Sequence, residues 1–219
     1  MAKQEIAKQQ DVPAFLKGFK PKHDVAVADS QGGGSYLPYI KLMSKTSPAV
    51  ETHDAKPNSW YLVEGENLVE LGKQVDVLPV TWRPLALDYG TKVSSHDPES
   101  ELYKRIKAEA DRPGQSSCLY GNQYLIWLAD KQKWVIFFAC SKSARRESHV
   151  ITAALGVPST LTSRTAKNDK GTWAIPTLIA CNSKLSSLPE EKDALEQIEK
   201  FENPPQLEDK ELATGSSRD

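Results

Sequence analysis

The chain is predicted to fold as a mainly β domain with inserted helices. Two segments rich in β-branched and aromatic residues, 123–129 (QYLIWLA) and 134–141 (WVIFFACS), flank a polar turn, which is the pattern of a β-hairpin. A helix pattern follows, and a second strand pair, 160–166 and 171–181, comes after it with a short basic turn between the strands. The hydrophobic content of 39% is sufficient for a folded core around these strands.

The N-terminal part combines an arm with the first strands. Residues 1–34 are polar and end in three glycines, so they predict a flexible arm. The segment 36–43 (YLPYIKLM) predicts a first strand, and residues 59–89 predict two or three more. Because proline cannot donate a ladder hydrogen bond, Pro79 and Pro84 place this part at a sheet edge or at a bulge.

A helix interrupts the strands at about 97–111. Asp97-Pro98-Glu99 supplies a cap and a proline for the first turn, and Arg112-Pro113-Gly114 ends the helix. A narrow apolar stripe lies between these signals: Leu102, Tyr103, Ile106 and Ala110. We expect this helix to be an insertion into the β domain or a cover over one end of it.

The central strand and the next helix are the clearest elements. The segment 134–140 is apolar on both faces, which predicts a strand inside the sheet. Ser143 stands where an N-cap belongs, and Gly156 before Val157-Pro158 stops the helix. Between them, apolar residues recur at helical spacing: Ala144, Ile151, Ala154 and Leu155.

The C-terminal region predicts one short helix and a disordered tail. Ser187 and Glu190 have the spacing of a capping box, and a helix over 187–202 would present Leu195, Ile198 and Phe201 on one face. Asn203-Pro204-Pro205 ends it, and the acidic residues 203–219 are predicted to be disordered.

Strands followed by one helix and a closing hairpin correspond to the second half of an oligonucleotide/oligosaccharide-binding (OB) barrel. We therefore predict an OB-fold-like β-barrel over 35–186, with a helix between its third and fourth strands and flexible termini. In that barrel the loop of the last hairpin contacts single-stranded nucleic acid.

Charge is divided unevenly along the chain. The net charge is −1, but residues 189–219 hold ten acidic and four basic residues, a balance of −6 that leaves +5 on the first 188. A basic body with an acidic tail is typical of a protein that binds a polyanion and uses its tail to compete with it or to recruit partners. A purely solubilising tail would have the same composition.

Several function classes are disfavoured. The chain has no apolar run long enough to span a membrane and no secretory leader, so we expect a cytoplasmic protein. It also lacks a Walker loop, a dinucleotide fingerprint, a nucleophile elbow and a metalloprotease His pair.

The three cysteines, Cys118, Cys140 and Cys181, lack metal-site spacing and predict buried free thiols. We expect no enzymatic activity, metal or cofactor, although an enzyme with unfamiliar catalytic groups stays open.

Basic residues with aromatic neighbours are the candidate binding residues, because cations neutralise phosphates and rings stack on bases. Positive charge in the first turn of a helix opposes the macrodipole, which favours a ligand for the cations near residue 143. Solvated turns and half-buried sheet residues are the alternative interpretation of the same pattern. The candidates for nucleic-acid binding are Lys142, Arg145, Arg146, Arg164, Lys167, Lys170, Trp173, Trp82, Arg83, Tyr89 and Lys41.

With these segments in view, the chain resembles the small single-stranded-DNA-binding proteins encoded in bacteriophage replication regions. The segments that carry the resemblance are 36–43, 75–85, 134–156 and 161–176, together with Ser47-Pro48. It implies sequence-independent binding of single-stranded DNA, with RNA left open as a partner, in the cytoplasm of a bacterial host. The tail is then a candidate for recruiting replication or recombination proteins. The tail departs from the phage pattern because it ends in Ser216-Ser217-Arg218-Asp219 without an aromatic residue. The alternative is a phage structural or host-interaction protein whose β domain is a protein–protein interface.

Overall fold

The structure is a computed structural model that describes residues 13–16, 30–31, 37–114, 116–169, 171–181 and 184–203. Short 3₁₀ turns occupy Ala14–Leu16 and Ala129–Lys131. The helices are α1 (Pro48–Thr52), α2 (Glu101–Ala110), α3 (Lys142–Ala153) and α4 (Glu191–Glu202). The strands are β1 (Ser30–Gln31), β2 (Tyr39–Leu42), β3 (Trp60–Glu64), β4 (Asn67–Gly72), β5 (Val75–Asp88), β6 (Val93–Ser95), β7 (Cys118–Leu128), β8 (Lys133–Ala139), β9 (Ser159–Asn168) and β10 (Gly171–Ala180).

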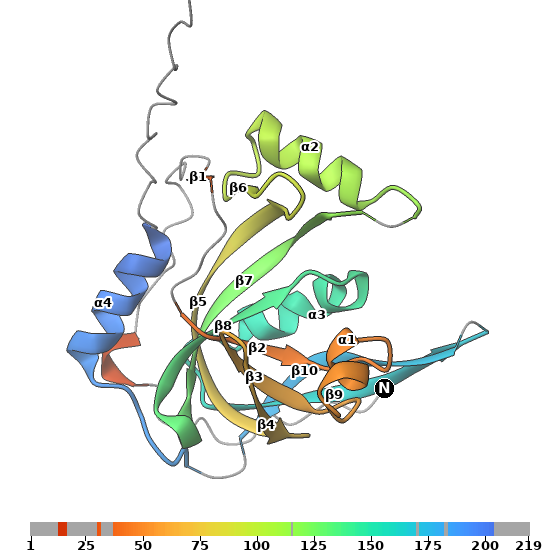
Figure 1. Ribbon diagram of the computed structural model, residues 1–219. Coiled ribbons are helices and arrows are strands. Elements are labelled where there is room, and N and C mark those ends of the chain that lie inside the picture. Colours follow the sequence, from red (N-terminus) through yellow and green to blue (C-terminus); the bar gives the residue numbers. More distant parts are fainter. Residues whose placement is uncertain are drawn as a thin grey trace, which may run out of the picture.

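The strands of the described residues form one curled sheet in the order β1-β6-β5-β7-β8-β2-β3-β4, with β9 added to β5 and β10 to β9 (Figure 1). Strand β5 connects the β9–β10 hairpin to the rest of the sheet: Val75–Val77 pairs with β9, and the stretch from Val77 to Asp88 pairs with β7. Strand β2 runs parallel to β8, whereas the other pairings are antiparallel. The predicted mainly β class is confirmed, and so is the interior position of β8.

The two faces of the sheet are covered by different helices. Successive residues of a strand point to opposite faces. In β7, Tyr124 and Ile126 therefore pack with α3, whereas Leu125 and Trp127 pack with α4. Figure 1 shows α3 and α4 on opposite sides of the long strands β5 and β7. The residues of the helices that enter these two clusters are Ala144 and Ile151 of α3, and Ala194, Ile198 and Phe201 of α4.

The N-cap of helix α3 lies two residues before the predicted one. The Ser141 hydroxyl accepts a hydrogen bond from the backbone N–H of Ala144 at 3.1 Å, so Ser141 and not Ser143 is the N-cap. Strand β8 already ends at Ala139, which leaves the cap to the first serine available. Gly156 follows the helix with a φ of +75°, which confirms the predicted stop.

Helix α2 covers one end of β5 and β7, as its stripe predicted. Tyr103 and Ile106 are buried against Ala86 and Cys118. The helix starts later than expected, because the Ser100 hydroxyl is its cap and accepts from the Tyr103 N–H at 3.1 Å. The Asp97 carboxylate instead accepts from the Glu99 N–H and forms a turn before the helix.

Helix α4 does not use the predicted capping box. It begins at Glu191, and the Ser187 hydroxyl instead donates to the Ala129 carbonyl oxygen at 2.6 Å. Leu195, expected on the buried face, is 47% exposed, and Ala194 is buried in its place. Ser187 is therefore held by the β7–β8 connection and does not cap α4.

The proline predictions for β5 were partly confirmed. The pairing of β5 with β7 has a bulge between Pro79 and Thr81. At Pro84, β5 pairs with only one strand of the described residues, β7. The Pro84 carbonyl oxygen is 2.9 Å from Nδ1 of His96.

Of the predicted N-terminal arm, only two short pieces belong to the described residues. Leu16 is buried in the cluster on the α4 side, and Ser30–Gln31 pairs with β6. These contacts were not predicted from the sequence. The rest of the arm and residues 204–219 of the predicted tail lie outside the described residues.

Candidate nucleic-acid interface

The exposed face of α3 carries a ridge of nitrogen-containing side chains. Lys142, Arg146 and His149 are exposed and lie at i, i+4 and i+7, which is one face of a helix. No acidic side chain of the described residues forms an ion pair with Lys142 or Arg146. Both cations are therefore available to a dissolved anion. We call these three residues the α3 ridge.

On one side of the ridge, α3 contacts the β9–β10 hairpin. The indole N–H of Trp173 donates to the Ser143 hydroxyl at 3.0 Å, and Arg164 forms an ion pair with Glu147. Trp173, one of the candidate rings, is 36% exposed. An accessible ring thus lies beside the α3 ridge.

On the other side, Arg145 connects α3 to β7 and α2. Its guanidinium lies 3.9 Å above the ring of Tyr120 and forms an ion pair of 3.3 Å with Asp111. It also donates to the Cys140 carbonyl oxygen at 2.6 Å. Lys107 approaches the same Tyr120 ring at 5.6 Å. Arg145 is therefore held in place, with only part of its charge left for a ligand.

Three of the candidates meet around Cys140 at the end of β8. Burial raises the pKa of the Cys140 thiol, and the charges of Lys41 and Arg145 act against this rise. Burial of its hydroxyl likewise raises the pKa of Tyr89, and nearby Cys140 and Tyr39 add to the effect. Of these candidates, Arg145 contacts Cys140 directly, through its hydrogen bond to the Cys140 carbonyl oxygen, while the charge of Lys41 acts on the half-buried thiol.

The three cysteines form no disulfide with one another in the described part of the chain. Cys118 and Cys181 are buried, whereas Cys140 is only half-buried.

Arg83 lies away from the other candidates, on the α4 side of the sheet. Its guanidinium is 4.4 Å from the centre of the Phe201 ring and donates to the Phe201 carbonyl oxygen. Its Nε donates to the Gln123 side chain at 2.9 Å. Burial lowers the pKa of Arg83 to about 10. These contacts give Arg83 a role in docking α4 onto the sheet.

The remaining candidates have different positions. Trp82 is half-buried and packs against the cluster on the α3 side of the sheet. Lys167 is exposed near the end of β9, and Lys170 lies outside the described residues. Of the predicted basic residues, Lys142, Arg146 and Arg164 therefore gather at α3, whereas Arg145 is turned toward β7 and α2.

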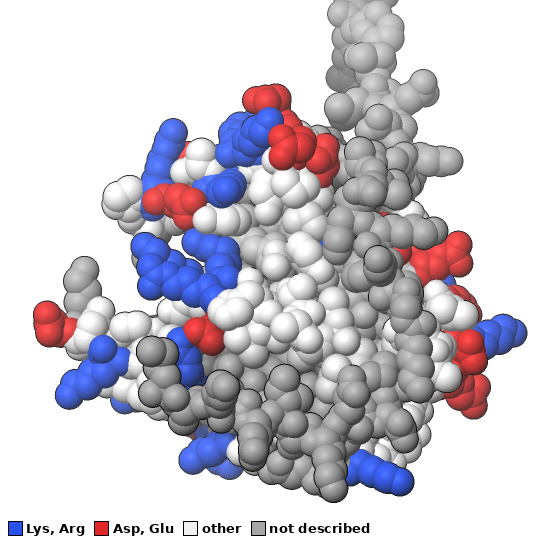
Figure 2. Space-filling view, turned by 180° about the vertical axis from the view of Figure 1, so that it is seen from behind, with Lys and Arg blue, Asp and Glu red and all other residues white. Residues whose placement is uncertain are grey.

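The distribution of charge follows this arrangement. Figure 2 shows Lys and Arg side chains gathered along the side that carries α2, α3 and the β9–β10 hairpin. Asp and Glu side chains are seen on both sides: some lie among these cations, and others gather on the opposite side, where α4 lies. An anionic ligand would therefore approach on the α3 side, where its charge is attracted.

Sequence reasoning did not select Tyr120, the ring beneath Arg145. Its partners Asp111 and Arg145 come from the end of α2 and from α3, so no local spacing reveals the cluster. The alternation of β7 does place Tyr120 on the same face as Tyr124, which packs with α3. That alternation was the one available signal.

Comparisons with known proteins found no matching family, no matching curated protein and no matching solved structure. Within the described ranges, no three His, Cys, Asp or Glu side chains come together in a way that could hold a metal ion. None of the described helices has both the length and the apolar character needed to cross a membrane.

Proposed function

We propose that the protein binds single-stranded DNA without strong sequence preference and organises it during replication or recombination. The observation that carries this proposal is the exposed α3 ridge, with the partly exposed ring of Trp173 on one side and the Arg145–Tyr120 pair on the other. Unpaired cations attract phosphates, and rings beside them stack on bases of any sequence. The role is non-catalytic: binding alone uses all of these features.

The order of the elements supports an OB-type interpretation of the domain. Strands β5, β7 and β8, helix α3, and the hairpin of β9 and β10 follow one another in that order, and β5 pairs with both β7 and β9. The domain differs from a closed OB barrel in one respect. The strand that pairs in parallel with β8 is β2, whereas a closed barrel would have its last strand there. We therefore propose an open variant of the OB barrel, in which the β9–β10 loop brings Lys167 to the bound strand.

The α3 ridge is tested by the double variant Lys142→Ala/Arg146→Ala. Both side chains are exposed, so the fold should be retained. Each lost phosphate contact flattens the dependence of log affinity on log salt by about 0.7 for a single strand. We expect weaker binding of oligo-dT and a slope flatter by about 1.4. Tryptophan fluorescence titrations at several salt concentrations measure both.

The matched control is Lys131→Ala/Lys192→Ala, which removes two exposed cations on the α4 side. It should leave the affinity and the salt slope unchanged. A folded ridge variant with the affinity and slope of the unmodified protein would exclude the α3 ridge as the binding surface.

Trp173 is tested by replacement with alanine and with phenylalanine. A stacked base contributes about 1–3 kcal/mol to binding, so Trp173→Ala should lose that amount, and Trp173→Phe should keep most of it. Ser143→Ala removes the acceptor of the indole N–H but keeps the ring. If Ser143→Ala weakens oligo-dT binding as much as Trp173→Ala does, the ring positions the hairpin and does not stack.

A further inference from the structure

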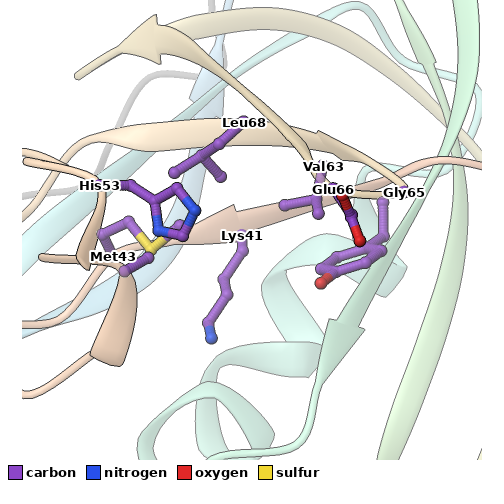
Figure 3. Close-up of a pocket in the computed structure, with 9 residues that line it drawn as sticks. Lys41, Met43, His53, Val63, Gly65, Glu66 and Leu68 are labelled. Atoms are coloured by element: carbon purple, nitrogen blue, oxygen red, sulfur yellow. The ribbon is translucent and has the colours of Figure 1, made fainter.

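A pocket of about 440 Å³ opens on the side of β2 and β3 that faces α1 (Figure 3). This volume lies within the range of pockets that hold small ligands. The pocket is built by strand β2, by the turn between β3 and β4, and by α1. Its lining residues are Tyr39, Lys41, Met43, Ala49, His53, Val63, Gly65, Glu66 and Leu68.

The inner part of the pocket is apolar. Met43 is only 2% exposed, and Val63 and Leu68 are half-buried. Tyr39 and Val63 are directly opposed in the β2–β3 register, so their side chains share a face of the sheet. Tyr39 is 47% exposed and forms an aromatic wall. An apolar floor beside an accessible ring fits a flat heterocycle.

The rim of the pocket is polar. Lys41 is exposed and has no ion-pair partner among the described residues. Figure 3 places it between His53 and Glu66. The His53 ring is held by a 2.6 Å hydrogen bond between its Nδ1 and the Thr52 hydroxyl. One cation and one nearby carboxylate suit a ligand with a single negative charge better than a polyphosphate, which Glu66 would repel.

The pocket and the candidate interface are carried by neighbouring segments. Strand β2, which bears Tyr39 and Lys41, pairs with β8. Cys140 follows directly after β8, and its carbonyl oxygen accepts a hydrogen bond from Arg145 near the start of α3. A strand bound along the α3 ridge can therefore extend into the pocket.

We propose that this pocket holds one nucleotide of the bound strand, with its base against Tyr39 and its phosphodiester on Lys41. The inference rests on the proposed function and names the place where one base leaves the stack of its neighbours. A phosphodiester carries one negative charge, which matches the single cation of Lys41. The Glu66 carboxylate then accepts a hydrogen bond from an amino or imino N–H of the base.

The experiment measures oligo-dT affinity across salt for Tyr39→Ala, Tyr39→Phe, Lys41→Ala and the matched control Lys45→Ala, an exposed lysine outside the pocket. Tyr39→Ala should weaken binding roughly 5- to 150-fold, because one stacking contact is lost, whereas Tyr39→Phe should stay near the unmodified protein. Lys41→Ala should flatten the salt slope by about 0.7, and Lys45→Ala should not change it.

The outcomes separate the pocket from the proposed function. If Lys142→Ala/Arg146→Ala weakens binding but Tyr39→Ala and Lys41→Ala, both folded, do not, the pocket proposal is overturned and the function stands. If the unmodified protein does not bind oligo-dT at any salt concentration, both proposals fail. Equal losses for Lys41→Ala and Lys45→Ala would show a diffuse charge effect and would also reject the pocket.

Discussion

Replacing Gly121 by alanine is expected to destabilise the protein by about 3 kcal/mol, the upper end of the usual cost of overpacking. An added β-carbon at Gly121 would lie 2.2 Å from the Ala139 carbonyl oxygen and 3.1 Å from the Cys140 Cα. These are backbone atoms of the neighbouring chain segment, so no side-chain rotation relieves the clash, and β7 and β8 must separate. Urea denaturation followed by tryptophan fluorescence measures the loss.

The control for Gly121 is Gly171→Ala. Gly171 has a φ of +136°, which is unfavourable for alanine, but an added β-carbon there would meet open space. Its replacement should cost about 1 kcal/mol, the conformational part alone. Equal losses at the two glycines would mean that the β7–β8 contact yields easily and that the predicted clash is wrong.

The same close approach links stability to the candidate interface. Arg145 donates to the Cys140 carbonyl oxygen, and the N-cap Ser141 follows directly. A shift of β8 at Ala139 therefore moves the first turn of α3 together with the α3 ridge. We expect the folded fraction of Gly121→Ala to bind oligo-dT more weakly than the unmodified protein does.

Much of the fold was predictable because the signals for its elements are local and long. The apolar segment 134–140 identified an interior strand, and Gly156 identified the end of α3. The starts of helices were less predictable. Each of two helices has two good caps by residue type: Ser141 and Ser143 for α3, and Asp97 and Ser100 for α2. The end of the preceding segment or a distant partner decided between them, and neither is visible in a short stretch of sequence.

The candidate site was predictable only where one element carries it. Cations in the first turn of a helix are an unfavourable arrangement that pointed to α3. The contacts that hold Arg145, Arg164 and Arg83 come from Asp111, Glu147 and Phe201. Each contact depends on how the sheet curls and which helix covers which face. Those facts follow from long-range strand pairing, such as the parallel contact of β2 with β8, and not from residue spacing.

A second large effect is expected from pH. His96 is only 8% exposed, and burial, helped by the nearby charge of Arg83, lowers its pKa to about 4 from 6.5, although the Pro84 carbonyl acts in the opposite direction. Below pH 6.5 the unfolded chain binds a proton at this position and the folded protein does not. The contribution of His96 to the free energy of unfolding is therefore complete above pH 6.5 and falls as the pH drops to about 4, by a total of about 3 kcal/mol.

His96→Asn separates this effect from the titration of carboxylates. The asparagine amide can still donate to the Pro84 carbonyl oxygen but cannot take up a proton in this range. Urea denaturation between pH 7.5 and 4.5 should show a steeper loss of stability for the unmodified protein than for His96→Asn. The exposed His149 is the matched control, and His149→Asn should keep the steep dependence. Parallel curves for the unmodified protein and His96→Asn would mean that the imidazole takes up its proton with the same pKa in the folded and the unfolded state, and the lowered pKa of His96 would then be wrong.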